Sequence, residues 1–394
     1  MRVAFDGRSL AVVKAMRGWD RYTVGLVGEM ARRGIEVTLF HRAIEPLNSE
    51  FVANLPCRVV GLEDRGGLYW EQVAVPLALW RGKFDLFHAP AERGIPFLAP
   101  CPTVLTVHSA TWSSYADLIA RGLLPGKPGD YLGYERASRW NFWSLYSQFG
   151  LARASHVLAP SEFARGEIVK LLRVPSRKVT VTPLAVHEQF RRSANPPEVR
   201  KETLSRLAVR EPYLLYVGGY EPHKNVAGLL ETFSLVRACR PDLALVLAGT
   251  NFLPEEVVAH AKRLGLDRER AVVFLVDVTD DLNDLYDEAQ LFVTMSWRET
   301  FCLPALEAMT RGKLVVASQW GAAPEIVGVA GRLVDPRDSQ AARDAILELL
   351  AAERNGLAQM VRHQAERFTW ADTGSRTLEV YQSLVGGRRP PSGI

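Results

Sequence analysis

Two glutamates in the segment RETFCLPALEAM, residues 298–309, stand where their carboxylates could bind a ligand. Glu299 follows the apolar, β-branched run LFVTMS, which is typical of a strand. Pro304 suits the first turn of a helix, because that turn does not use the N–H that proline lacks, and Gly312 suits the helix end. We therefore expect Glu299 in a strand-to-helix turn and Glu307 about one turn into the helix.

Both carboxylates would then lie near a helix N-terminus, where unpaired backbone N–H groups attract anions. A site that combines such amides with two carboxylates suits a ligand that carries both phosphates and hydroxyls, as a nucleotide-sugar does. Glu307 also has a purely structural explanation, because a helix dipole stabilises a carboxylate near its N-terminus. Glu299, in the preceding turn, has no comparable one.

A second candidate segment is YVGGYEPHKNVAGLLETF, residues 216–233, where two glycines end a strand and a lysine precedes an amphipathic helix. Gly218 and Gly219 would let the backbone approach a ligand closely, and Lys224 could neutralise a diphosphate. His108 closes a third apolar run, TVLTVHS, and could also face a ligand. Taken singly, each feature has a structural alternative: a glycine turn, a solvated lysine or a hydrogen-bonded buried histidine.

The elements that must position these residues recur twice along the chain. Apolar runs alternate with helical patterns, the first of them at 20–33, and this alternation implies parallel sheets covered on both faces. In the first half, strands are expected at 2–7, 36–42, 85–90, 103–109, 156–161 and 179–186. In the second half, they are expected at 213–219, 243–249, 272–276, 291–296 and 314–318.

This organisation predicts an α/β protein with two Rossmann-like domains facing an interdomain cleft, with ligands at the carboxyl ends of the strands. We place the N-terminal, acceptor-binding domain at 1–187 and the C-terminal, donor-binding domain at 188–366. The polar segment 187–211 would join them. Residues 367–394 are expected to form a helix, over 368–384, and a tail that pack back toward the first domain.

The composition excludes several other classes of protein. The chain of 394 residues is 47% apolar and 23% charged, as globular proteins are, and lacks a run of apolar residues long enough for a transmembrane helix. The start MRVAFDGRSL is a strand pattern rather than a signal peptide, and four scattered cysteines suit a reduced, cytoplasmic setting. Residues 1–185 carry seven more basic than acidic side chains, and the remaining residues carry three more acidic than basic ones. This asymmetry suits a phosphorylated or lipid-linked substrate or an anionic membrane face, although an unevenly charged solvated surface is the alternative.

Read together, these segments resemble the retaining glycosyltransferases of family 4, which have the GT-B fold. The family pattern is roughly Y-V-G-x₂-E-P-R-K-N and then E-G-F-G-L-P-x₂-E-A-M-A-x-G-x-P-V-V-A-S, and this chain has YVGGYEPHKN and RETFCLPALEAMTRGKLVVAS. The segments MRVAFDGRSL, TVLTVHSATW, ASHVLAPSEFAR, VTVTPLAV and FTWADTGSRTLEVY extend the similarity over nearly the whole chain. The opening and the VTPLAV segment look closest to bacterial mannosyltransferase-like members.

The resemblance implies roles for individual residues. Glu299 would bind hydroxyls of the donor sugar, and Glu307 would accept hydrogen bonds from the ribose. Four residues would present backbone amides to the sugar and phosphates: Thr300, Phe301, Cys302 and Leu303.

Five further residues are implied on both domains. Lys224 would hold the departing diphosphate, with Gly219 and His223 beside it. His108 would face the reacting sugar from the N-terminal domain, and Gly18 would lie in a loop near the phosphates.

The chain departs from the family pattern at several of these places. Its N-terminal loop reads GWDRY instead of G-x-G-x-Y, so Asp20 adds a negative charge where backbone should approach phosphate. His223 stands where arginine is common, which makes that phosphate contact weaker or dependent on pH. Ser109 replaces an aspartate after His108. Thr300 and Cys302 replace two glycines, which would reshape the sugar pocket.

The aromatic-rich segment YLGYERASRWNFWSLYSQF, residues 131–149, allows two interpretations. With Arg136 and Arg139 among its aromatic residues, it could bind an acceptor or a membrane surface. It could equally pack within the protein.

The sequence therefore predicts a glycosyltransferase of polysaccharide biosynthesis. It would move a hexose of the mannose or glucose type, with retention, from a nucleotide-diphosphate sugar such as GDP-mannose or a UDP-sugar. The acceptor would be a hydroxyl of a glycan, a lipid-linked molecule or a small molecule, and no metal or other cofactor is expected. Peripheral membrane contact through the basic N-terminal domain is possible, and nucleic acid is not an expected partner. Two alternatives remain: a nucleotide-sugar epimerase of the same fold, and a non-catalytic nucleotide-sugar-binding subunit. A nicotinamide dehydrogenase is disfavoured because no G-x-G-x-x-G follows the first strand.

Overall fold

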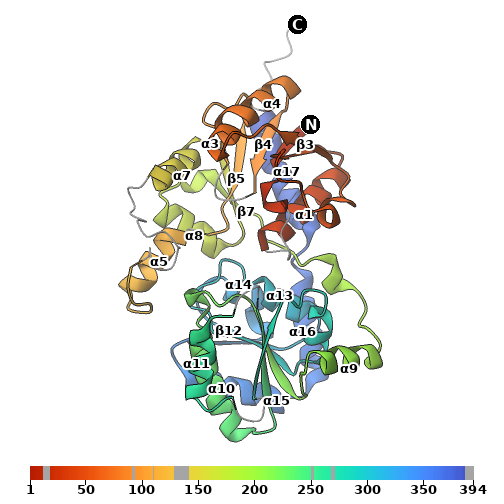
Figure 1. Ribbon diagram of the computed structural model, residues 1–394, viewed down its shortest axis with the longest axis vertical. Coiled ribbons are helices and arrows are strands. Elements are labelled where there is room, and N and C mark those ends of the chain that lie inside the picture. The colour runs from red at the N-terminus through yellow and green to blue at the C-terminus, as the bar shows by residue number, and fades with distance from the viewer. Residues whose placement is uncertain are drawn as a thin grey trace. The chain divides into compact units, whose positions relative to one another are not determined.

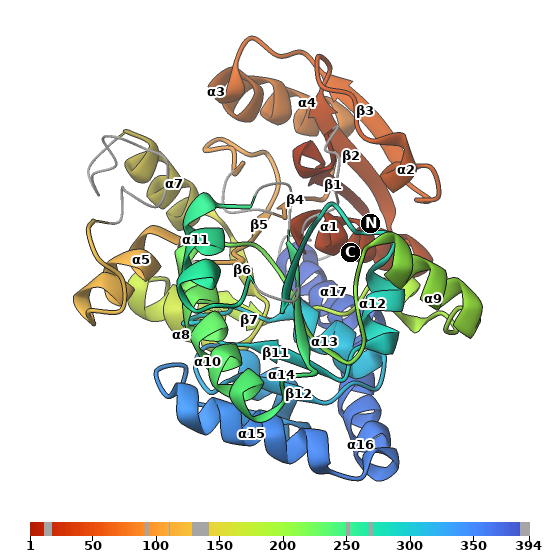
Figure 2. The ribbon, with the colours of Figure 1, turned by 60° about the horizontal axis from the view of Figure 1, so that its bottom comes forward.

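The computed structural model describes residues 1–11, 18–90, 94–109, 111–127, 142–249, 253–267 and 271–386. Contacts between residues divide the chain into two compact units. Unit 1 consists of Met1–Ala120, Pro125–Ala185 and Phe368–Ile394. Unit 2 consists of Arg121–Leu124 and Val186–Arg367. Each unit is built around one parallel sheet (Figures 1 and 2).

The sheet of unit 1 has seven strands in the order β3-β2-β1-β4-β5-β6-β7, and every pair of neighbours is parallel. The strands are β1 (Arg2–Asp6), β2 (Glu36–Arg42), β3 (Arg58–Leu62), β4 (Leu86–Ala89), β5 (Thr103–Thr106), β6 (His156–Ala159) and β7 (Val179–Val181). The α-helices are α1 (Gly18–Arg32), α2 (Ser49–Val52), α3 (Gly67–Tyr69), α4 (Val75–Gly82), α5 (Thr111–Ala120), α7 (Phe142–Arg153), α8 (Glu162–Leu171) and α17 (Trp370–Gly386). Two 3₁₀ turns, η1 (Arg8–Leu10) and η3 (Ser176–Lys178), and a π-helical turn, η2 (Trp70–Ala74), complete the described elements.

The sheet of unit 2 has six strands in the order β10-β9-β8-β11-β12-β13, again all parallel. The strands are β8 (Tyr213–Val217), β9 (Ala244–Gly249), β10 (Val272–Val276), β11 (Leu291–Thr294), β12 (Val315–Ser318) and β13 (Arg332–Val334). The α-helices are α9 (Pro197–Arg206), α10 (Val226–Cys239), α11 (Glu255–Arg263), α12 (Leu282–Glu288), α13 (Leu303–Thr310), α14 (Ala323–Val327), α15 (Ser339–Ala351) and α16 (Arg354–Glu366). Short 3₁₀ turns are η4 (Glu188–Arg191), η5 (Pro222–Lys224) and η7 (Gly328–Ala330).

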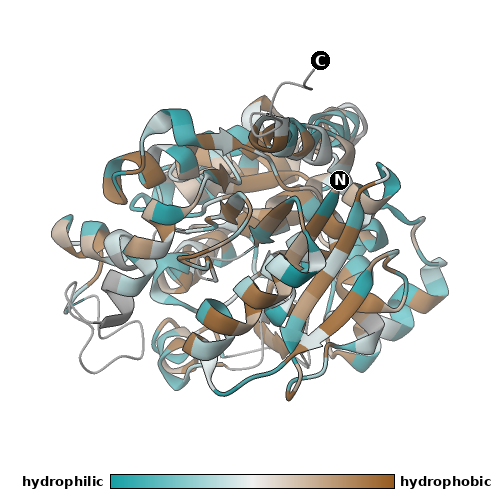
Figure 3. Ribbon diagram, turned by 90° about the horizontal axis from the view of Figure 1, so that it is seen from above, coloured by the Kyte–Doolittle hydropathy of each residue, from teal (hydrophilic) through white to brown (hydrophobic). Residues whose placement is uncertain are grey.

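The central strands form because continuous apolar runs bury both of their faces under helices. Phe5 of β1, Phe87 of β4 and Leu215 of β8 have no exposed surface. The helices carry both hydrophobic and hydrophilic residues (Figure 3), as helices that cover a sheet with one side must. The prediction of two parallel α/β sheets is therefore confirmed.

Three details differ from the sequence-based expectations. Strands β3 and β13 were not expected, because one is largely exposed and the other is only three residues long. The polar segment 187–211 is more than a connection, since it belongs to unit 2 and contains helix α9. That helix is held by the Thr203 hydroxyl, which donates a 2.8 Å hydrogen bond to Asp284 of α12.

The C-terminal helix α17 completes unit 1 by packing against α1. The contact is close at Gly25, where an added Cβ would lie 2.2 Å from Cζ2 of the Trp370 indole. Further along α17, the Tyr381 hydroxyl lies 2.5 Å from Nδ1 of His88, a fully buried residue of β4. The end of the chain therefore contributes to the core of the unit that its beginning forms.

We predict that Gly25→Ala destabilises unit 1 by about 1–3 kcal/mol, because the rigid indole of Trp370 leaves no room for a methyl group. Differential scanning fluorimetry should record this as a lower melting temperature. Gly166→Ala in α8 is the matched control, since a Cβ there meets nothing within 4 Å and alanine favours a helix. Equal melting temperatures for the two variants would contradict the proposed tight contact.

Candidate functional site

Glu299 lies in the turn between β11 and α13, as predicted. The loop after β12 holds this turn in place: the Ala322 N–H donates a 2.8 Å hydrogen bond to the Glu299 carbonyl. Gly321 has a φ of +73°, and a Cβ at that position would lie 2.7 Å from the backbone nitrogen of Glu299. Only glycine fits so close to the turn without displacing it.

The carboxylate of Glu299 pairs with Lys224 of turn η5. Lys224 Nζ lies 2.8 Å from one carboxylate oxygen and 3.0 Å from the other, and the Ser296 hydroxyl donates a 2.9 Å hydrogen bond to the same carboxylate. The side chain of Lys224 is 19% exposed and that of Glu299 is 14% exposed. The structure thus brings together two residues that lie 75 positions apart and that the sequence assigned to one site.

The ion pair fixes the charges of both partners. Burial alone would raise the pKa of Glu299, but the neighbouring charge of Lys224 and the hydrogen bonds from Lys224 and Ser296 hold it below its usual value. Burial alone would lower the pKa of Lys224, and the carboxylate of Glu299 raises it instead. Both residues are therefore ionised at neutral pH.

Turn η5 is tied to the Glu299 turn by the residues around Lys224. The Trp297 N–H donates a 2.8 Å hydrogen bond to the carbonyl of His223. Asn225, with a φ of +51°, caps α10 by accepting a hydrogen bond from the Gly228 N–H. Its side-chain amide donates to the Met295 carbonyl at 3.0 Å. These contacts hold Lys224 at the carboxyl ends of β8 and β11.

His223 is neutral at physiological pH, because burial and the positive charge of Lys224 lower its pKa to about 4. Two glycines precede it after β8. The Gly218 N–H donates to the Ala248 carbonyl at 3.0 Å, and the Gly219 carbonyl accepts a 2.6 Å hydrogen bond from the Tyr216 hydroxyl. Gly218, Gly219 and His223 therefore lie in one hydrogen-bonded segment that follows β8.

Glu307 lies within α13 and is 1% exposed. The hydroxyl of Tyr286, in α12, donates a 2.9 Å hydrogen bond to its carboxylate. Pro304 occupies the first turn of the helix, as predicted, and Gly312 follows the helix with a φ of +74°.

The residues between the two glutamates explain one departure from the family pattern. Cys302 caps the N-terminus of α13 with a φ of +71°, a left-handed conformation that costs least for glycine. Its side chain and that of Phe301 are buried, whereas Thr300 and Leu303 are partly exposed. The chain thus has a side chain at a position whose backbone favours glycine, which explains why glycine is usual there.

The two predicted residues of unit 1 have different surroundings. His108 is buried, donates from Nε2 to the Pro90 carbonyl at 2.9 Å and packs edge-on against Tyr22, and burial lowers its pKa to about 4. Gly18 was expected in a loop, but it is the first residue of α1. Asp20, which we expected to oppose phosphate, is instead buried in the first turn of this helix, where a carboxylate suits the helix dipole.

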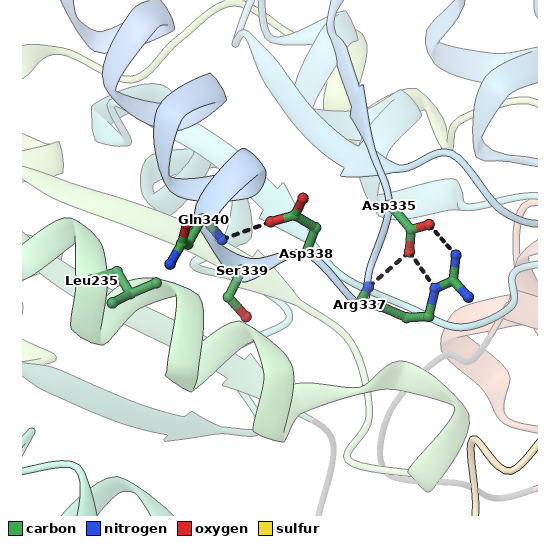
Figure 4. Close-up of a pocket in the computed structure, with 6 residues that line it drawn as sticks. All are labelled: Leu235, Asp335, Arg337, Asp338, Ser339 and Gln340. Atoms are coloured by element: carbon green, nitrogen blue, oxygen red, sulfur yellow. Dashed lines mark hydrogen bonds and ion pairs between the residues drawn. The ribbon is translucent and has the colours of Figure 1, made fainter.

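An open pocket of unit 2 lies at the start of α15 (Figure 4). It is lined by Leu235, Asp335, Arg337, Asp338, Ser339 and Gln340, none of them a predicted site residue. Asp335 pairs with Arg337, and Asp338 accepts hydrogen bonds from the N–H groups of Gln340 and Ala341. The polar side chains that line this pocket therefore bond to one another and to the backbone, and so stabilise the loop after β13. Throughout the ranges that the structure describes, no group of three or more His, Cys, Asp or Glu side chains is placed to hold a metal ion.

Sequence reasoning missed three residues of the site. Ser296 and Tyr286 hydrogen-bond the two glutamates, and Asn225 orients the segment after Lys224. Asn225 has a recognisable signal, because asparagine before a helix is a preferred N-cap. Tyr286 has none, since it reaches Glu307 from another helix. The aromatic segment 131–149 lies largely outside the described residues, which resume at α7.

Solved structures of other proteins share this architecture. HepE from Anabaena, in complex with UDP and glucose, has a TM-score of 0.72 at 20% identity over 98% of this chain and 100% of that one. WaaG, a glycosyltransferase involved in lipopolysaccharide biosynthesis, has a TM-score of 0.67 at 17% identity over the same shares. At these identities the likeness shows the fold, which is the GT-B fold of two-domain glycosyltransferases.

Family models identify the chain further. Residues 16–190 match the model described as Glycosyltransferase Family 4, and residues 211–352 match the one described as Glycosyl transferases group 1. Together these matches take in most of the chain, which therefore belongs to this family of glycosyltransferases. The resemblance noted from the sequence is confirmed.

Three named relatives illustrate the range of the family. The chain is 34% identical to O-antigen chain mannosyltransferase B of Escherichia coli over 59% of its own length and 62% of that protein. It is 26% identical to the D-inositol 3-phosphate glycosyltransferase of Mycolicibacterium gilvum over 94% of its length and 86% of that protein. Its match to the serotype-specific mannosyltransferase WbdA of E. coli spans 29% of that protein, so the chain covers less than two-thirds of these mannosyltransferases.

We predict that Lys224→Met lowers the free energy of unfolding by about 3 kcal/mol at pH 7, because it leaves the Glu299 carboxylate buried without its cation. The folded-state pKa of Glu299 is depressed, so the pair stabilises the protein above the unfolded value of 4.5 and this stabilisation is lost as the pH falls through the folded value. The difference in the free energy of unfolding between wild type and variant, measured by urea unfolding, should therefore decrease as the pH is lowered toward 4. The double variant Lys224→Met/Glu299→Gln should recover most of the loss. A gap that is independent of pH would contradict the ion pair.

We also predict that Cys302→Gly is more stable than Cys302→Ala by about 1 kcal/mol, because glycine relieves the left-handed backbone. Thermal unfolding of the two variants measures this difference. Buried Cys101, which has an ordinary φ, is the matched control, and there alanine should be the more stable replacement. The same ranking at both positions would argue against backbone strain at Cys302.

Proposed function

We propose that this protein is a retaining glycosyltransferase that moves a hexose from a nucleotide-diphosphate sugar to a hydroxyl acceptor. The observation that carries the proposal is the Lys224–Glu299 ion pair, held beside the N-terminus of α13. A cation, a fixed carboxylate and helix-terminal N–H groups in one place meet the needs of a ligand with both phosphates and hydroxyls.

The first demand of the reaction is to stabilise the departing diphosphate. Lys224 has three N–H donors, of which Glu299 needs at most two, and its raised pKa keeps it charged. The amides at the start of α13 provide a second, preorganised source of positive potential. Groups fixed before the reaction stabilise developing charge most effectively, because they need not reorient. In this proposal no metal ion is needed for the leaving group.

The second demand is to orient the sugar. Glu299 is ionised, so its carboxylate can accept hydrogen bonds from sugar hydroxyls while Lys224 holds it in place. A carboxylate engaged in this way is a poor covalent nucleophile. We therefore infer same-face substitution through a cationic sugar rather than a double displacement.

Glu307 and His108 take supporting roles in this proposal. Glu307 would accept hydrogen bonds from the ribose hydroxyls while Tyr286 keeps its carboxylate oriented. His108 is neutral and donates from Nε2 to a backbone carbonyl, which leaves Nδ1 as an acceptor for a sugar hydroxyl. His223 is also neutral and would contribute a hydrogen bond rather than a charge to the diphosphate.

The named relatives favour mannose as the transferred sugar, because two of them are mannosyltransferases. A GDP-mannose donor and a glycan or lipid-linked acceptor are the assignments that we propose. A lipid-linked acceptor would require the protein to work at a membrane surface. In the part of the chain that the structure describes, no helix combines the length and apolarity that a bilayer span requires.

We predict that Lys224→Ala lowers kcat about 100-fold or more with a smaller effect on donor affinity, because the leaving group gains most of its charge in the transition state. Glu307→Gln should instead weaken nucleotide-sugar binding about tenfold, the loss of about one charged hydrogen bond. Kinetics with a panel of nucleotide-sugars, together with thermal shifts by nucleotide diphosphates, separate these effects. Lys262→Ala, an exposed residue of α11, is the matched control and should leave both constants unchanged.

Three outcomes would contradict the proposal. Unchanged kinetics in Lys224→Ala and Glu307→Gln would remove the site assignment. Conversion of the donor without any acceptor would favour an epimerase, and binding of nucleotide-sugar without turnover of any donor would favour a binding subunit.

A further inference from the structure

The helical segment between β3 and β4 of unit 1 exposes a row of large apolar side chains. Four large apolar side chains form it: Leu68 is 37% exposed, Val73 38%, Leu77 42% and Trp80 68%. They come from α3, η2 and α4, which follow one another directly between residues 67 and 82. We refer to these four residues as the apolar stripe.

The four residues lie on one side of the helix because of the π-helical turn. Their spacing is five residues across η2, from Leu68 to Val73, and then four and three residues in α4. A π-helical turn places residues five apart on the same side, as an α-helix does for residues three or four apart.

The other side of the segment is fixed by the core. Trp70, Val75 and Leu79 repeat the same spacing and are buried in the hydrophobic cluster that contains Phe40 and Phe87. A rotation that hid the apolar stripe would expose these residues. The orientation of the segment, and with it the exposure of the stripe, is therefore set by the fold.

The exposed charges next to the stripe are mostly basic, and Glu63, which accepts a hydrogen bond from the Tyr69 hydroxyl of α3, is paired with Arg65. Arg81 and Lys83 lie one and three residues after Trp80 and are exposed, and Arg58 is exposed on the edge strand β3. Figures 1 and 2 both place α3 and α4 near that strand. The one carboxylate within the segment, Glu71, faces inward, where Arg8 and the Tyr146 hydroxyl donate hydrogen bonds to it.

We propose that the apolar stripe, with Arg81 and Lys83, docks unit 1 onto an anionic lipid surface. Tryptophan next to basic side chains suits the membrane interface, where the indole lies at the level of the headgroups and the cations bind lipid phosphates. The excess of seven basic residues in 1–185 adds long-range attraction to such a surface. Two copies of unit 1 docked through this stripe would instead bring like charges together. The inference rests on the proposed lipid-linked acceptor only for its purpose, since vesicle binding does not require turnover.

The test is cosedimentation of the full chain with phosphatidylcholine vesicles, with or without about one-third phosphatidylglycerol. We expect binding to the anionic vesicles that weakens with added salt and little binding to phosphatidylcholine alone. Leu77→Ser/Trp80→Ser and, separately, Arg81→Gln/Lys83→Gln should each reduce the partition coefficient about tenfold or more, because each removes one of the two contributions.

Matched variants in unit 2 provide the controls. Val329→Ser removes an apolar side chain that is 85% exposed, and Lys262→Gln/Arg263→Gln removes two exposed adjacent cations. Neither should change vesicle binding. The charge variants replace exposed side chains only, so they keep the test valid even if the apolar variant proves unstable in a thermal melt.

Several results would overturn the inference. They are failure of the wild-type chain to bind anionic vesicles, equal losses in the control variants, or a wild-type dimer that Leu77→Ser/Trp80→Ser converts to a monomer. The thermal shift caused by nucleotide diphosphates, measured on the same samples, tests the proposed function separately from membrane binding. Variants that lose vesicle binding should keep that shift.

Discussion

The ion pair between Lys224 and Glu299 is the interaction on which the candidate site depends. It joins the loop after β8 to the loop after β11, two neighbouring strands whose carboxyl ends meet at the same edge of the sheet. Burial alone would favour the neutral form of each partner, and the charge of the other partner shifts each pKa back toward the charged form. Hydrogen bonds from Ser296 and the backbone contacts of His223 then limit how far either side chain can move. The same pair thus orders the site and supplies the charges that a phosphorylated sugar would meet.

Unit 1 uses buried polar groups differently. Arg8 lies between Asp6 and Glu71, and its guanidinium lies 4.2 Å from the ring centroid of Trp70. The charges of these two carboxylates more than offset the effect of burial and raise the pKa of Arg8. Because Glu71 and Trp70 belong to the π-helical turn, this network and the core together fix the orientation of the whole segment up to α4. An inward-facing charge network therefore determines which apolar side chains face outward.

Local patterns were sufficient for much of the fold and for part of the site. Alternating apolar runs and helices predicted both parallel sheets, and Pro304 and Gly312 marked the ends of α13. The strands β3 and β13 were not recognised, because an exposed edge and a three-residue strand lack the continuous apolar run of a buried strand. The grouping of Lys224 with Glu299 came from the resemblance to a family and not from spacing, since contacts between residues far apart in sequence leave no local pattern. The left-handed backbone of Cys302 and the hydrogen bond from Tyr286 to Glu307 were likewise unpredictable, because both depend on how separate elements pack.

The return of α17 to unit 1 has a consequence for synthesis of the chain. On the ribosome, domains generally fold as they emerge, starting from the N-terminus. Here Gly25 and His88 emerge early, but Trp370 and Tyr381, which contact them, emerge only after all of unit 2. The first unit to be translated must therefore wait, with part of its core uncovered, until α17 has been synthesised. Unit 2, which is continuous apart from four residues, faces no such delay and can finish folding first.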